Sequence, residues 1–200
     1  MKIKKLISAL VLGSMLVGLS GCNITDFSAE NLLRPPKAVG DEAEIEQLIA
    51  KTADSGYTLK YPKNGKFRSA IIMTDLDGND SNEAVAFFRN SAETSSVHML
   101  VMYSKDNSWE IASDNIFETT DIDSVDFADL TGNGKAEIIV NSTTYTPNVG
   151  KLSCYSYSEG KTNEVGSGQS CSSFVTGDFD NDGTSEIMSL VLYTTENEAL

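Results

Sequence analysis

The 200-residue chain is poor in the residue types that most enzymes and zinc sites use: it has one histidine, one tryptophan and three cysteines. His98 is the single histidine, and it stands between Val97 and Met99 in an apolar stretch, where a structural histidine is far commoner than a catalytic base. The sequence contains no glycine-rich phosphate loop, no nucleophile elbow and no zinc-ligand cluster. We therefore expect that the protein is not an enzyme.

Basic residues are scarce as well. The chain has 15 lysines and arginines against 29 aspartates and glutamates, which gives a formal net charge of -14. Such a chain is repelled by the phosphates of nucleic acid and by anionic lipid. The acid excess excludes nucleic acid as a partner, and it fits either the uptake of divalent cations or a merely soluble acidic surface.

The N-terminus combines a basic start with a short uncharged run. Three lysines precede residues 6–19, which carry no charge and are too few to span a membrane as a stable helix. The segment resembles the signal of Gram-positive lipoproteins, whose Leu-Ser-Gly-Cys box here covers residues 19–22. The resemblance implies that residues 1–21 are removed and that Cys22 carries a diacylglyceryl lipid, which anchors the protein outside the cytoplasmic membrane, at the bacterial cell surface. The alternative is an ordinary signal peptide, which leaves Cys22 a plain thiol.

A tether and one helix are expected next. Residues 22–40 are polar, lack periodicity and contain Pro35-Pro36, so they predict an extended spacer. Residues 41–56 predict a short amphipathic helix that Asp41 can cap and that Gly56 can end. Its apolar stripe is expected to dock on the first sheet, with partner binding as the alternative; the stripe consists of Ile45, Leu48 and Ile49.

From residue 57 onward the pattern is that of strands. Short segments rich in β-branched and aromatic residues alternate with turn residues, which predicts an all-β region over 57–200. Two cycles of four strands and one half cycle follow each other: 67–74, 83–89, 97–103 and 109–112, then 122–127, 136–143, 151–157 and a weak fourth, then two strands from 172. Four strands in about 50 residues match a β-propeller blade, so we expect an open or incomplete array of about two and a half blades.

An Asp-rich turn separates the first two strands of each cycle. We call these turns the first, second and third Asp loops; they cover residues 75–83, 129–137 and 178–186. Each begins with an aspartate, closes with a glutamate eight positions later and leads into an apolar strand. The first aspartate recurs after about 54 and then about 49 residues, a spacing that indicates repeated units.

These segments resemble FG-GAP or VCBS-type repeats, the blades of the integrin α-subunit propeller. The best match is residues 174–177 followed by the third Asp loop, and the resemblance covers roughly residue 67 to the C-terminus. It implies a propeller fold and a preference for calcium, without an implied activity.

Calcium takes six to eight oxygen ligands, and alternate residues of a tight loop point at one centre. In the third Asp loop the expected ligands are three aspartates, one backbone carbonyl and a closing glutamate: Asp178, Asp180, Asp182, Thr184 and Glu186. Without a cation these carboxylates would repel each other. The alternative is that aspartate and glycine here simply form good turns.

The other two Asp loops have fewer acids at the expected ligand positions. The first offers Asp75, Asp77, Asn79, Ser81 and Glu83, with Asp80 where the pattern prefers glycine. The second offers Asp129, Thr131, Asn133, Lys135 and Glu137. Calcium affinity is expected to fall from the third loop to the first and then the second, following the number of carboxylates.

Cys154 and Cys171 flank a predicted hairpin and would lie in a compartment that permits disulfides. Counting back from the turn at residues 159–160 places Cys154 opposite residue 165 or 166, so a bridge requires the fourth strand to bulge. The sequence leaves this disulfide open.

Together these features predict a membrane-anchored extracytoplasmic lipoprotein with calcium-stabilised propeller-type repeats that binds an unknown protein or glycan. Two alternatives stay open: a truncated or purely structural propeller fragment without a partner, and a fragment of a propeller hydrolase or lyase. The sequence does not determine the oligomeric state.

Overall fold

The computed structural model describes residues 40–54, 56–146 and 148–192, which all belong to one unit, 38–200. The predicted signal peptide (1–21), the lipidated Cys22 and all of the tether except Gly40 lie outside the described residues. Within the part of the chain that is described, no helix is long and apolar enough to cross a membrane.

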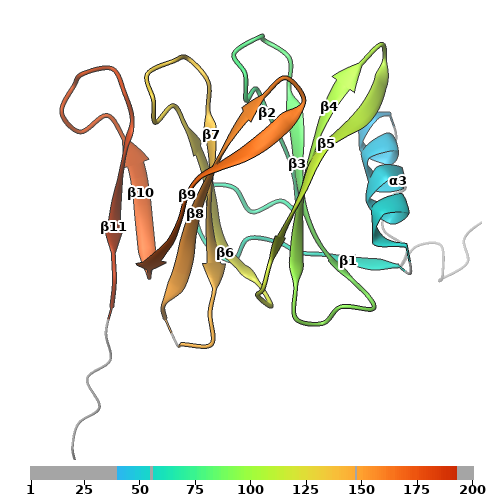
Figure 1. Ribbon diagram of the computed structural model, residues 1–200, viewed down its shortest axis with the longest axis horizontal. Helices are drawn as coiled ribbons and strands as arrows, with labels where there is room; N and C mark the ends of the chain where they lie inside the picture. The colour runs from blue at the N-terminus through green and yellow to red at the C-terminus, as the bar shows by residue number, and fades with distance from the viewer. Residues whose placement is uncertain (1–39, 55, 147, 193–200) are drawn as a thin grey trace, which may run out of the picture. The chain divides into compact units, whose positions relative to one another are not determined.

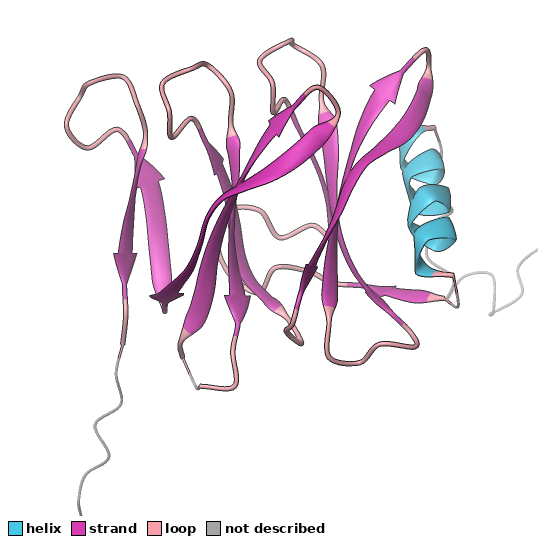
Figure 2. Cartoon of the chain, viewed as in Figure 1, coloured by secondary structure: helices cyan, strands magenta, loops and turns pink. Residues whose placement is uncertain are grey.

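The described chain is one helix followed by antiparallel sheets (Figures 1 and 2). The helix is α3 (Asp41–Ala53), and the first sheet contains β1 (Tyr57–Leu59), β2 (Ile71–Thr74), β3 (Glu83–Asn90), β4 (Val97–Lys105) and β5 (Ser108–Phe117). The second sheet contains β6 (Ile122–Ala128), β7 (Glu137–Thr143), β8 (Gly150–Ser158) and β9 (Lys161–Cys171), in sequence order. The third contains β10 (Ser173–Gly177) and β11 (Glu186–Leu190).

This arrangement confirms the predicted fold class, an all-β, open propeller-like array with one short helix. The three Asp loops join β2 to β3, β6 to β7 and β10 to β11, and they lie along one edge of the array (Figure 2). Among the described residues no sheet closes on itself. The weak fourth strand of the second cycle is in fact β9, a strand of 11 residues.

The first strand of the first sheet is divided, which the sequence did not indicate. β1 and β2 both pair with β3 on the same side, at its two ends, whereas a single strand from residue 67 was predicted. Residues 60–70 between them form a crossing segment that leaves the first sheet and reaches the second. There the Lys63 N–H donates to the Ile122 carbonyl (3.2 Å) and the Asn64 N–H to the Asp123 carbonyl (2.7 Å).

The main core lies between the first and second sheets. Val85 and Phe87 on β3 pack against the cluster that contains Ile138 and Val140 on β7, and all four side chains are fully buried. The alternate residues of these two strands are buried on the opposite face, for example Phe88 and Ile139. Strands buried on both faces are apolar throughout rather than alternating, and this explains the continuous apolar runs that follow the Asp loops.

Helix α3 covers the free face of the first sheet. Ile45 and Ile49 are fully buried against Phe88, Leu100 and Trp109, and Leu48 is partly buried beside them. The predicted docking of this stripe is therefore confirmed.

The predicted ends of the helix were inexact. Asp41 is the first helical residue rather than the cap, which is Gly40, and the helix ends at Ala53, before Gly56. Acidic residues in the first turn still favour the positive end of the helix dipole; they are Asp41, Glu42 and Glu44.

The third sheet leaves one apolar face exposed. Its inner side chains, Phe174 and Ile187, pack on Ile139 and Leu152 of the second sheet. Its outer face carries Val175, paired with Met188 across the two strands, and both are more than half exposed.

Neither cysteine is bridged. Cys154 stands opposite Gly166, as counting back from the turn predicted, and Cys171 stands opposite Gly150. β8 and β9 do shift register twice, but the shifts leave the two thiols on different rungs of the ladder. Burial raises the pKa of both thiols.

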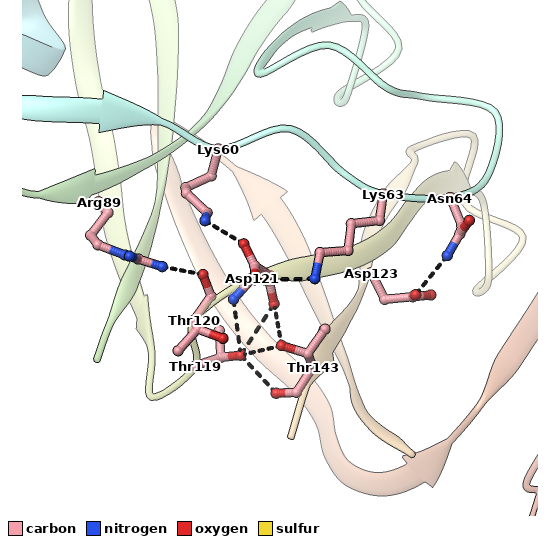
Figure 3. Close-up of polar contacts among 9 residues, drawn as sticks. All are labelled: Lys60, Lys63, Asn64, Arg89, Thr119, Thr120, Asp121, Asp123 and Thr143. Carbon is pink, nitrogen blue, oxygen red and sulfur yellow. Dashed lines mark hydrogen bonds and ion pairs between the residues drawn. The ribbon is translucent and has the colours of Figure 1, made fainter. Parts of the chain in front are cut away.

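A polar cluster fastens the crossing segment to the second sheet (Figure 3). The Asp121 carboxylate forms ion pairs with Lys60 and, at 3.1 Å, with Lys63, and Arg89 from β3 donates to the Thr120 carbonyl. Partial burial of Asp121 acts against its ionisation, but the hydrogen bonds and charges of the two lysines outweigh this and lower its pKa. The cluster thus joins three segments that are distant in sequence.

Replacing Asp121 tests this junction. Asp121→Asn should lower the free energy of unfolding by about 2 kcal/mol at pH 7, because a carboxylate hydrogen-bonded to charged groups is lost. The folded state lowers the pKa of Asp121. The ionised carboxylate therefore contributes to the free energy of unfolding above the pKa that Asp121 has in the unfolded chain, and this contribution disappears as the pH falls through the pKa in the folded state. Urea unfolding at pH 7 and at pH 3 measures both effects. Glu118→Gln, which removes an exposed carboxylate nearby, is the control; an equal loss in both variants would contradict the role of the junction.

Candidate metal centres in the Asp loops

The first aspartate of each Asp loop organises its loop by accepting backbone hydrogen bonds. The Asp75 carboxylate accepts from the N–H groups of residues 78, 79 and 80, at 2.8 to 3.2 Å. Asp129 accepts from residues 131 to 134, at 2.7 to 3.2 Å, and Asp178 from residues 182 and 183. Desolvation opposes ionisation of Asp75 and Asp129, but these backbone donors outweigh it and lower the pKa of both.

The closing glutamate completes each loop in the same way. Glu83, Glu137 and Glu186 each accept a hydrogen bond of 2.8 Å from the N–H of the residue after the first aspartate. The side chain at the fifth position of each loop also bonds to the loop backbone. The Oδ1 atoms of Asn79, Asn133 and Asp182 each accept from the N–H two positions later. Three loops with different acid contents therefore share one hydrogen-bond scheme. This scheme explains, without a metal, why the first aspartate and the closing glutamate stand eight positions apart in all three.

Two positions in each loop adopt left-handed backbone conformations. At the fourth position these are Gly78, Gly132 and Asn181, with φ between 62° and 75°. At the sixth they are Asp80, Gly134 and Gly183, with φ of 63°, 80° and 91°. Asp80 does occupy a glycine position, as the pattern suggested, and aspartate is among the few other residues that tolerate it.

Neighbouring Asp loops are in direct contact. The Leu76 carbonyl accepts from the Ala136 N–H (3.0 Å), and the Asp129 carbonyl accepts from the Ser185 N–H (2.8 Å). A Cβ on Gly78 would lie 2.8 Å from the Gly134 carbonyl oxygen. A backbone hydrogen bond therefore joins the first loop to the second and the second to the third, with the acceptor at the second position of one loop and the first of the other.

The structure brings two of the three expected ligand sets together. Among the described residues, two groups of carboxylates have ligand atoms within 4.8 Å of one another. One lies in the third Asp loop and the other in the first; they consist of Asp178, Asp180, Asp182 and Glu186, and of Asp75, Asp77 and Glu83. In the second loop Asp129 and Glu137 are the only acids, and they do not form such a group. The expected order of calcium affinities stays a prediction.

The first Asp loop is the more buried of the two, which the sequence did not reveal. Glu83 is 3% exposed, and one carboxylate oxygen of Asp77 (Oδ1) is buried without a hydrogen-bond partner among the described residues. Burial, together with the charges of Asp77 and Asp75, raises the pKa of Glu83. The negative charges of Glu83 and Asp77 also act on Tyr157. Together with burial, they raise the pKa of Tyr157 to about 12. The acids of the third loop, in contrast, are mostly exposed.

His98 lies in the first sheet, away from these loops in sequence. Its Nδ1 is 2.9 Å from both carboxylate oxygens of Asp114, and its ring stacks on Phe88 with 4.8 Å between centroids. Its side chain is almost fully buried between β3 and β5, so its contacts are those of a core residue.

Comparison with family models, with curated proteins and with solved structures finds no match to this chain.

The contribution of the contact between neighbouring Asp loops to stability can be measured with two alanine variants. Gly183→Ala introduces a Cβ with no described heavy atom within 4 Å, so it should cost about 1 kcal/mol from its left-handed backbone alone. Gly78→Ala adds a clash with the Gly134 carbonyl and should cost about 1 to 3 kcal/mol more. Urea unfolding of the two variants gives the difference. Equal costs would mean that neighbouring Asp loops separate without penalty.

Proposed function

We propose that the protein is a lipid-anchored, extracytoplasmic binding module whose first and third Asp loops hold calcium. One observation carries the calcium proposal. In the first loop Asp77 has one buried carboxylate oxygen (Oδ1) without a hydrogen-bond partner among the described residues, and its carboxylate lies in a group whose ligand oxygens, with those of Asp75 and Glu83, are within 4.8 Å of one another. A buried, unpaired carboxylate oxygen beside two further acids is costly, and a cation would offset this cost.

The donor set favours a hard cation. Both groups offer only carboxylate oxygens, without histidine or cysteine, and this is the chemistry of calcium and magnesium rather than of zinc. The hydrogen bonds within the loops do not compete with a metal, because an ionised carboxylate has about four acceptor sites. Calcium fits better than magnesium, since it accepts irregular shells with many protein ligands.

A bound cation would act on stability rather than on chemistry. The Asp loops connect strands and support one another, so a cation in the first or third loop would strengthen one edge of the array. A ligand at a hundred times its Kd stabilises a folded protein by about 2.7 kcal/mol. The binding surface would then depend on calcium through the rigidity of this edge.

Calorimetric calcium titration of the full chain, with thermal melts in calcium and in chelator, tests the proposal. Calcium should bind and raise the Tm, and Asp178→Asn and Asp77→Asn should each remove part of the effect. Asp106→Asn, in the β4–β5 turn, is the matched control and should leave binding unchanged. Absence of binding heat, with a cooperative melt that calcium does not shift, would reduce the Asp loops to simple turns.

Glu83→Gln separates the cost of the buried charge from the benefit of the metal. The folded state raises the pKa of Glu83, so ionised Glu83 costs stability above that pKa, and the cost disappears as the pH falls below it. Glutamine can still accept from the Leu76 N–H and carries no charge. In chelator at pH 7 the variant should melt above the wild type; in calcium it should gain less than the wild type. A lower Tm in chelator would show that the acid group stabilises the loop without metal.

The anchor is tested separately, at Cys22. Cys22→Ser should move the protein from the membrane fraction to the soluble fraction of the expressing bacteria, because the thioether is lost. A variant that stays membrane-bound would refute lipid anchoring at this residue and leave the calcium proposal unaffected.

A further inference from the structure

A polar cavity lies at the end of the second sheet opposite the Asp loops. Its volume is about 490 Å³, which is within the usual range for small-molecule sites. Segments distant in sequence form its wall: the crossing segment, the start of β6, the end of β7 and the β7–β8 connection, through Lys63, Asn64, Asp123, Asn141, Thr144 and Thr146. The polar cluster of Figure 3 fixes the position of the crossing segment here, so the cavity depends on that junction.

The lining is rich in groups that form hydrogen bonds without carrying charge. Eight of the thirteen lining residues are threonine, serine or asparagine. Hydroxyl and amide groups both donate and accept, so they match a ligand that presents many hydroxyls of its own. Thr146 bonds to the Thr144 hydroxyl through its backbone N–H and carbonyl, and not through its own side chain.

The two charged groups of the wall are neutralised or already engaged. Lys63 is paired with Asp121 at 3.1 Å. The Asp123 carboxylate accepts from Asn64 Nδ2 (2.9 Å) and Asn141 Nδ2 (3.3 Å), and thereby holds both amides at the wall. Its negative charge disfavours an anionic ligand, and the lysine charge is compensated, so the cavity suits a neutral ligand.

Asn141 is a fixed part of this wall. It is 1% exposed, its Nδ2 donates to Asp123, and its Oδ1 is buried beside Gly150.

The β7–β8 connection, which forms part of the wall, also carries an exposed aromatic residue. Tyr145 is 91% exposed, and in sequence it stands between Thr144 and Thr146, which both line the cavity. A tyrosine ring offers an apolar face for the C–H groups of a sugar and a hydroxyl for its polar edge.

We propose that this cavity binds a neutral glycan, with Tyr145 stacking on a sugar ring at the rim and the threonine and asparagine side chains hydrogen-bonding its hydroxyls. The inference rests on the proposed binding function and names its ligand class. The site lies at the opposite end of the sheet from the Asp loops, so its occupancy can be measured independently of calcium.

Saturation-transfer NMR on the full chain, in a detergent without a sugar headgroup, tests the inference. The probes are the neutral disaccharides maltose, lactose, mannobiose and diacetylchitobiose, with glucose 6-phosphate as the anionic comparison. At least one neutral disaccharide should bind, and more tightly than the phosphate. Thr146→Val and Tyr145→Ala should each weaken its Kd by about tenfold, the effect expected for one lost hydrogen bond or one lost stacking contact.

Two further variants serve as controls. Tyr145→Phe keeps the ring and should bind within about twofold of the wild type, since stacking survives. Thr94→Val changes an exposed threonine in the β3–β4 connection, the equivalent turn of the first sheet, and should have no effect.

Three outcomes would overturn the inference: no disaccharide binds, the phosphate binds more tightly, or binding survives both Thr146→Val and Tyr145→Ala. A calcium melt on the same samples keeps the two proposals apart. If no disaccharide binds but calcium raises the Tm, only glycan binding in the cavity is refuted. If no disaccharide binds and calcium does not change the Tm, the proposed function is refuted as well.

Discussion

The structure depends on the double-sided burial of its central strands. β3 and β7 are apolar on both faces, so each sheet needs a cover on each side. Helix α3 covers one side of the first sheet, the second sheet covers the other, and the third sheet covers the far side of the second. The outer face of the third sheet, with Val175 and Met188 exposed, is where the described array stops. One requirement, burial of both faces, thus explains both the stacking order and the apolar surface left at the end.

Hydrogen bonds and charge have separate roles at the edge that carries the Asp loops. The loops keep one backbone geometry whether they hold four carboxylates or two, because in each the first aspartate accepts from the N–H groups of the fifth and sixth positions and the closing glutamate from that of the second. The additional acids therefore are not needed for the turn. In the first loop the additional acid Asp77 is half-buried, and its charge, with the burial of Glu83, raises the pKa of Glu83. A role in cation binding gives the extra acids a physical reason.

The opposite end of the array is organised by the crossing segment. By leaving the first sheet at residue 60 and returning at 70, the chain brings Lys60, Lys63 and Asn64 onto the second sheet. The same detour closes one side of the polar cavity. The two ends of the array therefore differ in chemistry: clustered carboxylates at one, and at the other hydroxyls and amides beside lysines that are paired with Asp121.

The sequence by itself determined the features that repeat locally. Short segments rich in β-branched and aromatic residues, turn residues and the recurring aspartate predicted an all-β array of four-stranded units, and the apolar stripe within 41–56 predicted a docked helix. It also identified the acids that the first and third Asp loops bring together, since their spacing is set within nine residues of chain.

Contacts between sheets were decided only by the tertiary structure. The divided first strand, the hydrogen bond from Ala136 to Leu76 and the meeting of Asn64 with Asp123 join residues that are tens of positions apart in sequence. Local propensity contains no signal for such pairs, because they form only when neighbouring sheets are packed. The free state of Cys154 and Cys171 was settled in the same way, by the register of two strands and not by the cysteine count.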